Sequence, residues 1–386
     1  MLKGKVFIFF LVLLLFFNSA FARDIDPLEE QLNNLETQKI EEFLKRLNQT
    51  SGEYIPEIDF RDLINIFRKE GFTYDLRGLF SGLIKYLFKE IVANTNLLGK
   101  LIILAVILAI LQNLQTAFEK DVIGKLAYGV CYLVIIGIGI NSFIIASKIG
   151  KEAINNMVSF MQALLPMLLT LLVSLGGVTA SAVFHPVVLM SVSAVSTLIK
   201  DLLIPIIFFS AIMAIVNNIT NSFQLTRFSG LLKELCIAIL GFLLSVFLGI
   251  MIVQGTAAAV VDGVSVRTAK FATKNFVPIV GGIFADAIDT VISCSLLLKN
   301  AIGVVGVIIV FIMCAFPVLK ILSVIFIYKL AAALIQPIGD EKIVNSLNGL
   351  ANSLIMLFVT VSSVAMMFFI AVTIIIGAGN ITVMMR

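Results

Sequence analysis

From Leu97 to the C-terminus the chain is a series of apolar runs, each long enough to cross a lipid bilayer. A helix needs about 20 mostly apolar residues to span the hydrocarbon core, and a spanning segment has to satisfy its own backbone hydrogen bonds. The pattern therefore predicts a helical membrane domain over 97–386. The expected spans lie near 98–118, 126–147, 157–176, 178–199, 202–221, 235–261, 301–335 and 350–377.

The run at 301–335 is too long for one span and has Pro317 and Lys320 near its middle, so we expect a broken helix or a tight pair. The predicted fold class is all-α: a polytopic membrane protein with about seven to nine transmembrane or re-entrant helices. Of the 386 residues, 60% are hydrophobic and 13% charged, which excludes a soluble enzyme. A net charge of +4 scattered over loops gives no basis for binding nucleic acid.

The first 22 residues have the three parts of a secretory signal peptide. Lys3 and Lys5 are the basic part, 6–17 is the apolar part, and an A-x-A cleavage site follows at 20–22. Twelve apolar residues are short for a span, so we predict cleavage before Arg23, with an uncleaved signal anchor as the alternative. After cleavage the mature chain would begin outside the cytoplasm.

Residues 23–96 form the one strongly polar part of the sequence, with ten of the 28 basic and fourteen of the 24 acidic residues. Apolar residues at helical spacing, among them Ile40, Leu44 and Leu47, predict a small amphipathic-helical region. A second stripe over 72–92 predicts a helix that either lies along the membrane surface or packs on its own small domain. The expected organisation is a signal peptide, an exported helical region with a membrane-surface helix, and a multispanning domain: 1–22, 23–96 and 97–386.

The sequence carries no enzyme motif. It lacks H-E-x-x-H, G-x-S-x-G and the Walker A pattern, so we expect no enzymatic activity, no metal and no cofactor, and an energy source outside this chain. His185, the single histidine, fits helix packing better than a proton relay, which would need an acidic partner nearby. The four cysteines show no C-x-x-C spacing and are interpreted as packing residues.

The most informative segment is 262–300. Three basic residues share one helical face, a Pro-Gly-Gly break follows, and two carboxylates lie three positions apart. This arrangement fits a re-entrant or interfacial element shielded by protein or water, and an amphipathic loop helix with solvated charges is the alternative. The candidate gate or docking residues in this segment are Arg267, Lys270, Lys274, Pro278, Gly281, Gly282, Asp286 and Asp289.

A second break ends the long run at 335, and its candidate residues are Gln336, Pro337, Gly339 and Asp340. Proline and glycine stop the helix, and an acid near the start of the next helix is favoured by the helix dipole, so capping explains it without transport. Within the spans, small residues are expected to allow close helix approach. Examples are Gly137, Gly139, Gly303 and Gly306.

The positive-inside rule gives an ambiguous topology. With an exported N-terminus, Lys120 and Lys125 are cytoplasmic, as the rule expects. If every later run crosses fully, the basic residues at 148–151, Lys200 and 267–274 fall outside, against the rule. A re-entrant hairpin within 155–199 would return Lys200 and 267–274 to the cytoplasm.

The block from Arg267 to Asp340 resembles the stage III sporulation protein AE family in four motifs that occur in the expected order. They are K-F-x(5)-V-P-I-V-G-G-x(3)-D-A-x-D-T-V at 270–291, L-L-L-K-N-A-x-G at 296–303, P-V-L-K at 317–320, and Y-K-L-A-A-A-L-I-Q-P-I-G-D at 328–340. The signal peptide, the exported polar region and the multispanning part resemble the same family. Ala285 departs from it, since a serine is common there.

The resemblance implies a multi-pass protein of the mother-cell membrane that surrounds the forespore, with its N-terminal region extracytoplasmic. It implies a membrane core component of a channel or secretion-like complex required for endospore formation. The implied partners are other stage III sporulation membrane proteins, including ring-forming subunits, an ATPase acting in trans, and membrane lipid. The residues alone leave two alternatives: a stand-alone secondary transporter that uses Asp286 and Asp289, or a scaffold without a path.

Overall fold

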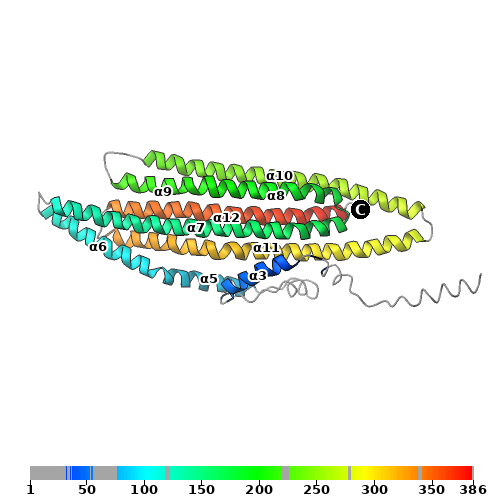
Figure 1. Cartoon of the computed structure of the whole chain (residues 1–386), viewed down its shortest axis with the longest axis horizontal. Helices are drawn as coiled ribbons and strands as arrows, with labels where there is room; N and C mark the ends of the chain where they lie inside the picture. Colours follow the sequence, from blue (N-terminus) through cyan, green and yellow to red (C-terminus); the bar gives the residue numbers. More distant parts are fainter. Residues whose placement is uncertain are drawn as a thin grey trace, which may run out of the picture.

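The computed structural model describes residues 32, 35, 37–52, 54, 76–117, 122–219, 226–276, 280–337 and 341–384. In these ranges every regular element is a helix, as the all-α prediction requires. The long helices run side by side along one axis, and two shorter helices lie against one flank (Figure 1). The predicted signal peptide, 1–22, lies outside the described residues.

The flanking helices come first in the chain, followed by the bundle. Their bounds are α3 (Gln38–Ser51), α5 (Leu76–Ala93), α6 (Thr95–Ala117), α7 (Val122–Ser174), α8 (Val178–Leu198), the π-helix η1 (Ile199–Leu203), α9 (Ile204–Ile219), α10 (Thr226–Phe276), α11 (Val280–Ile335) and α12 (Glu341–Met384).

Six helical segments of the described chain are long and apolar enough to cross a membrane, which indicates a membrane protein. The described chain thus shows fewer such helices than the seven to nine expected, because predicted spans merge. The spans 126–147 and 157–176 are one helix, α7, which continues through the polar residues between them. Lysine and glutamate are good helix formers, so a polar stretch interrupts the hydropathy without ending the helix. Likewise, η1 joins 178–199 to 202–221 without a break.

Glycine, rather than charge, ends the α7 helix. Gly176 has φ 87°, in the left-handed region, and the chain turns there into α8. Prolines do not break the bundle: Pro317 lies inside α11, so the run at 301–335 is one continuous helix and neither a broken helix nor a pair. Proline is tolerated in membrane helices because neighbouring helices, hydroxyl side chains or water can satisfy the freed backbone groups.

The segment 262–300 also differs from the re-entrant element that the sequence suggested. α10 continues to Phe276 and α11 begins at Val280, so the segment forms the meeting ends of two long helices. Gly281 and Gly282 lie in the first turn of α11 rather than in a backbone break. Residues 277–279, which include Pro278, lie outside the described part.

α12 packs against α7, α9, α10 and α11 and occupies the middle of the bundle. Small residues let it approach closely, as predicted. A Cβ added at Gly303 would collide with Ile376 of α12, and one at Gly139 would collide with Leu350. Gly306 is similarly packed against Leu164. Gly137 is an exception, because a Cβ there would meet open space.

The N-terminal helices pack on the bundle rather than on a separate domain. α3 has the predicted amphipathic pattern: Ile40, Leu44 and Leu47 are buried against the bundle while the charged side chains between them point outward. α5 lies along α11 with Leu79 and Leu83 buried. Its apolar residues 80, 84 and 88 remain exposed.

Candidate functional site

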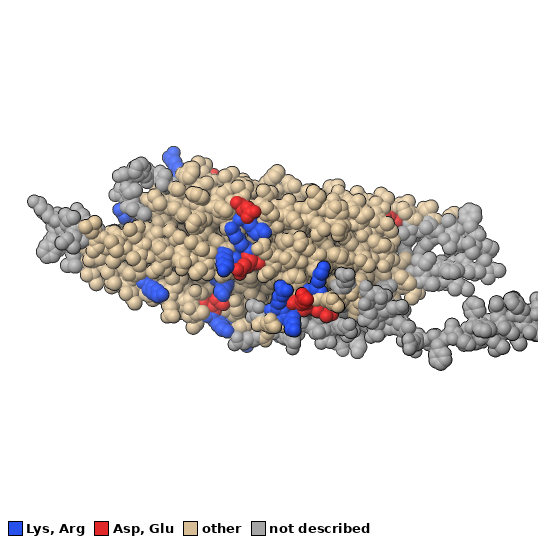
Figure 2. All heavy atoms as spheres, viewed as in Figure 1, with Lys and Arg blue, Asp and Glu red and all other residues tan. Residues whose placement is uncertain are grey.

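Charged side chains gather in the middle of the long axis (Figure 2). We call this set the charged belt, and it comprises Glu42, Arg46, Glu90, Lys148, Lys151, Glu152, Lys200 and Lys320. The belt divides the bundle into two halves. The α6 half contains 95–117, 122–147 and 204–219, and the α8 half contains 153–174 and 178–198.

On one side, the belt joins α7 to η1. Lys200 Nζ donates a hydrogen bond to Asn155 Oδ1 at 2.6 Å, and Lys148 Nζ lies 4.0 Å from Glu152 Oε1. A π-helix has about one more residue per turn than an α-helix. Short π-helical turns inside α-helices frequently mark functional positions. Here η1 carries the charged residues Lys200 and Asp201 in an otherwise apolar stretch. The π-helix and the belt therefore coincide.

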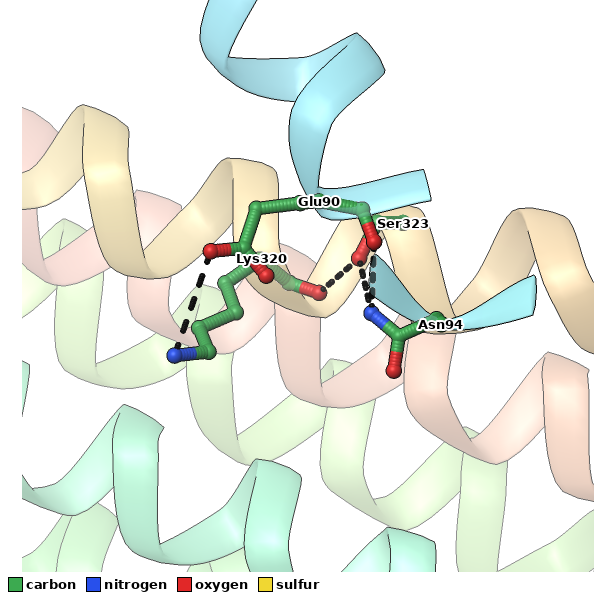
Figure 3. Close-up of polar contacts among 4 residues, drawn as sticks. All are labelled: Glu90, Asn94, Lys320 and Ser323. Atoms are coloured by element: carbon green, nitrogen blue, oxygen red, sulfur yellow. Dashed lines mark hydrogen bonds and ion pairs between the residues drawn. The ribbon is translucent and has the colours of Figure 1, made fainter. Parts of the chain in front are cut away.

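On the other side, the belt attaches α5 to α11 (Figure 3). Lys320 Nζ lies 4.0 Å from Glu90 Oε1, and the Glu90 side chain is only 15% exposed. Asn94 Nδ2, at the end of α5, donates to Ser323 Oγ at 3.2 Å and to the Glu90 carbonyl at 2.8 Å. Because Ser323 is fully buried, this contact satisfies a polar group inside the bundle.

Aromatic side chains strengthen the attachment of the N-terminal helices. The rings of Tyr86 on α5 and Phe316 on α11 meet edge to face at 4.7 Å, and those of Phe43 on α3 and Phe160 on α7 meet at 5.8 Å. Arg46 lies over the outer side of the Phe43 ring. A helix with a charged outer face is not stable in hydrocarbon. The outer face of α3 therefore faces water or another protein.

A pocket of about 310 Å³ lies where these helices meet. Its floor is apolar and aromatic, and Arg46, Glu152 and Lys320 line it. A pocket of this composition is suited to hold a side chain or an amphiphile.

The sequence-predicted residues lie at the two ends of the bundle, away from the belt. Arg267 is exposed near the end of α10, and Asp289 is partly buried near the start of α11. Around them, Lys270 and Lys274 on α10 and Gly281, Gly282 and Asp286 on α11 lie on described helix, but their side chains are outside the description. Gln336 and Pro337 form an exposed turn after the opposite end of α11. Gly339 and Asp340 lie outside the described residues.

The full length of α11 separates these two predicted sets, so the structure does not bring them together (Figure 1). Sequence reasoning missed the contacts of the belt, because each of its charges looks like an isolated interruption of an apolar run. The signal that could have found it is that Lys148 and Lys200 each lie between two apolar runs that the structure joins into continuous helix, and that Lys320 lies near the middle of the run at 301–335.

Sequence reasoning also missed a buried lysine in α11. Lys299 is fully buried and its Nζ donates to the carbonyl of Ile376 on α12 at 2.6 Å. It fits there because Gly379 has no side chain; a Cβ at Gly379 would collide with the Lys299 ammonium. A lysine inside an apolar run was a readable signal, since charges inside membrane helices are rare and usually buried against protein.

Among the described side chains, no three of His, Cys, Asp or Glu gather as a metal site would require. All four cysteines are free thiols, and Cys236 and Cys314 are buried in the apolar core, which agrees with a packing role.

Comparison with known proteins places the chain in a family. A family model described as stage III sporulation protein AE matches residues 58–379. The stage III sporulation protein AE of Bacillus subtilis (strain 168) is 43% identical over 358 residues, which cover 93% of this chain and 90% of that protein. No solved structure matches. These matches confirm the resemblance seen in the four motifs, and the chain belongs to the stage III sporulation protein AE family, which supports a role in sporulation.

Proposed function

We propose that this protein is the membrane core component of a multiprotein channel or secretion-like complex between mother cell and forespore, required for endospore formation. It would lie in the mother-cell membrane around the forespore, with ring-forming subunits and an ATPase in trans as partners. Family membership supports the link to sporulation. The surface of the bundle supports the idea of partners.

The observation that carries the proposal is a bundle too long for one bilayer. Helices of 44 to 56 residues span about 65–85 Å at 1.5 Å per residue, whereas the hydrocarbon core is about 30 Å thick. In α7, residues 122–147 belong to the α6 half and residues 153–174 to the α8 half. Each of these segments is about as long as the hydrocarbon core is thick. One half must therefore lie outside the hydrocarbon.

We assign the α6 half to the bilayer and the α8 half to the extracytoplasmic space, because charged α3 covers part of the α8 half. The rest of the α8 half is too apolar to face water: Met190 is 72% exposed, and Val173 and Val178 are exposed nearby. Exposed apolar surface of this kind marks protein–protein contact sites. Partner subunits are the natural cover for it.

This assignment also gives a topology. With the N-terminal region extracytoplasmic, the α6–α7, α9–α10 and α11–α12 connections would be cytoplasmic. That location suits Lys120 and Lys125 under the positive-inside rule. The α10–α11 end, with Arg267, would then be extracytoplasmic. A cytoplasmic location for 267–274 requires a re-entrant hairpin within 155–199, and α7 and α8 are both long helices there.

A path for cargo would run between this protein and its partners, not through a single bundle. Large side chains fill the described interior: Phe143, Phe160, Phe247, Phe368 and Tyr328 are all fully buried. This packing disfavours a stand-alone transporter. Uptake of solute by the purified protein in liposomes, abolished by Asp286→Asn, would favour the transporter instead.

Cysteine accessibility in sporulating cells tests the proposal. The four native cysteines are first replaced by serine or alanine, and single cysteines are then introduced at Lys39 on α3, Met190 on α8 and Ile103 on α6, all exposed on the isolated chain. A membrane-impermeant maleimide should label the Lys39→Cys variant and leave Ile103→Cys unlabelled. Met190→Cys should be protected in the complex and labelled when the partner genes are deleted. Equal labelling of Met190→Cys with and without partners would contradict the proposal.

A further inference from the structure

A second groove lies in the charged belt, between α7 and the η1–α9 segment, and has a volume of about 380 Å³. We infer that this groove binds an anionic phospholipid, with its phosphate at Lys148 and Lys151 and an acyl chain along Ile204 and Phe208. Ser147 completes the polar end of the groove. The inference rests on the proposed placement of the α6 half in the bilayer, but not on the proposed partner subunits.

The polar end of the groove has donors to spare. Lys151 makes no hydrogen bond or ion pair with any described residue, and Lys148 has only the 4.0 Å contact with Glu152. Two ammonium groups thus outnumber the single carboxylate of the groove, that of Glu152. An anion with several acceptor oxygens would satisfy them.

The apolar end of the groove leads away from the belt into the α6 half. Ile144, Ile204 and Phe208 line it, and exposed Phe209 and Ile145 continue the apolar surface. The order along the helices is the order of a phospholipid: charge first, then hydrocarbon. A free inorganic anion would make no contact with these apolar side chains.

The local backbone shapes the wall of the groove. Ile204 N–H bonds to the Ile199 carbonyl, the five-residue spacing of a π-helix. Pro205 has no N–H, so it cannot bond to the carbonyl of Asp201 four residues earlier. Ile204 and Pro205, where this π-helix ends, lie in the wall of the groove that Lys148 and Lys151 also line.

Binding to the purified full-length protein tests the inference. Short-chain phosphatidylglycerol, short-chain phosphatidylcholine and inorganic phosphate are titrated into protein in a neutral detergent, and bound lipid is counted by native mass spectrometry. Phosphatidylglycerol should bind, and Lys148→Gln with Lys151→Gln should weaken it at least about tenfold, since each lysine near an anionic lipid contributes enough for several-fold in affinity. Lys39→Gln with Lys45→Gln, two exposed lysines of α3, is the matched control and should change nothing.

Separate experiments test the apolar lining of the groove and the requirement for an anionic lipid. Phe208→Gln should weaken phosphatidylglycerol binding without changing the retention of the protein in detergent. Equal binding of phosphatidylcholine and phosphatidylglycerol, an unchanged affinity in the double lysine variant, or competition by inorganic phosphate at the same concentration as the lipid would overturn the inference. None of these results depends on partner proteins, so the proposed complex can fail while this site stands.

Discussion

Asp262 of α10 receives a hydrogen bond at 2.6 Å from the backbone N–H of Ala180, at the start of α8. Its other carboxylate oxygen accepts the N–H of Thr179 at 2.9 Å. The first N–H groups of a helix have no partner inside the helix and attract negative charge. A buried carboxylate from a distant helix therefore caps α8 and joins it to α10.

Removing the charge of Asp262 should destabilise this end of the bundle. Asp262→Asn keeps one acceptor but loses the charge, and should lower the free energy of unfolding by about 1–3 kcal/mol, the usual cost of spoiling a buried charged hydrogen bond. Asp262→Ala should lower it further. Unfolding in detergent by increasing SDS measures the loss. Asp201→Asn, an exposed aspartate, is the control; equal effects of the two Asn variants would refute the cap.

The Glu90–Lys320 pair predicts a charge-swap rescue. Glu90→Lys and Lys320→Glu should each loosen α5 from α11, and the double variant should recover part of the loss. The coupling should be only about 0.5 kcal/mol, because Lys320 is 46% exposed and half-solvated ion pairs contribute little. The same SDS titration of the four proteins gives the coupling energy. A coupling of zero would mean that Asn94, Ser323 and the aromatic contacts alone attach α5.

Gly379 should not tolerate a side chain. Gly379→Ala would force the buried Lys299 ammonium away from the Ile376 carbonyl, and should cost about 1–3 kcal/mol. In a Lys299→Ala background the same change should cost less, because the colliding atoms are gone.

Gly377→Ala is the matched control for that experiment, since a Cβ at Gly377 meets open space. Its effect on SDS unfolding should be small. If Gly377→Ala and Gly379→Ala destabilise equally, the loss comes from the helix itself and not from Lys299.

The docking of α3 depends on its buried face. Ile40→Asp would place a carboxylate at a fully buried position, which costs several kcal/mol unless the helix leaves its site. We therefore expect α3 to detach and become sensitive to added protease while the bundle stays folded. Limited proteolysis with mass spectrometry measures this. Gln38→Asp, on the exposed face, should leave the cleavage rate unchanged; equal rates in the two variants would contradict the docked arrangement.

Much of this architecture could be predicted, because it depends on local composition. Apolar runs identified the helices, the spacing of Ile40, Leu44 and Leu47 identified the buried face of α3, and Gly303 and Gly139 identified close helix contacts. The described chain has fewer helices long and apolar enough to span a membrane than hydropathy predicted, for a physical reason. Hydropathy detects polar residues, but the continuity of a helix depends on its backbone hydrogen bonds. Lysine and glutamate preserve those bonds, so the helix continues through them. Gly176, in the left-handed conformation, ends the α7 helix.

The sequence by itself determined that this is an apolar, helical chain of the stage III sporulation protein AE family, since composition, periodicity and motifs are properties of neighbouring residues. The tertiary structure decided which distant residues meet: Asp262 at the start of α8, Glu90 beside Lys320, and Lys200 beside Asn155. Those contacts depend on the order, direction and relative shift of whole helices. Such relations are set by packing along the full length of the bundle, and no local pattern encodes them.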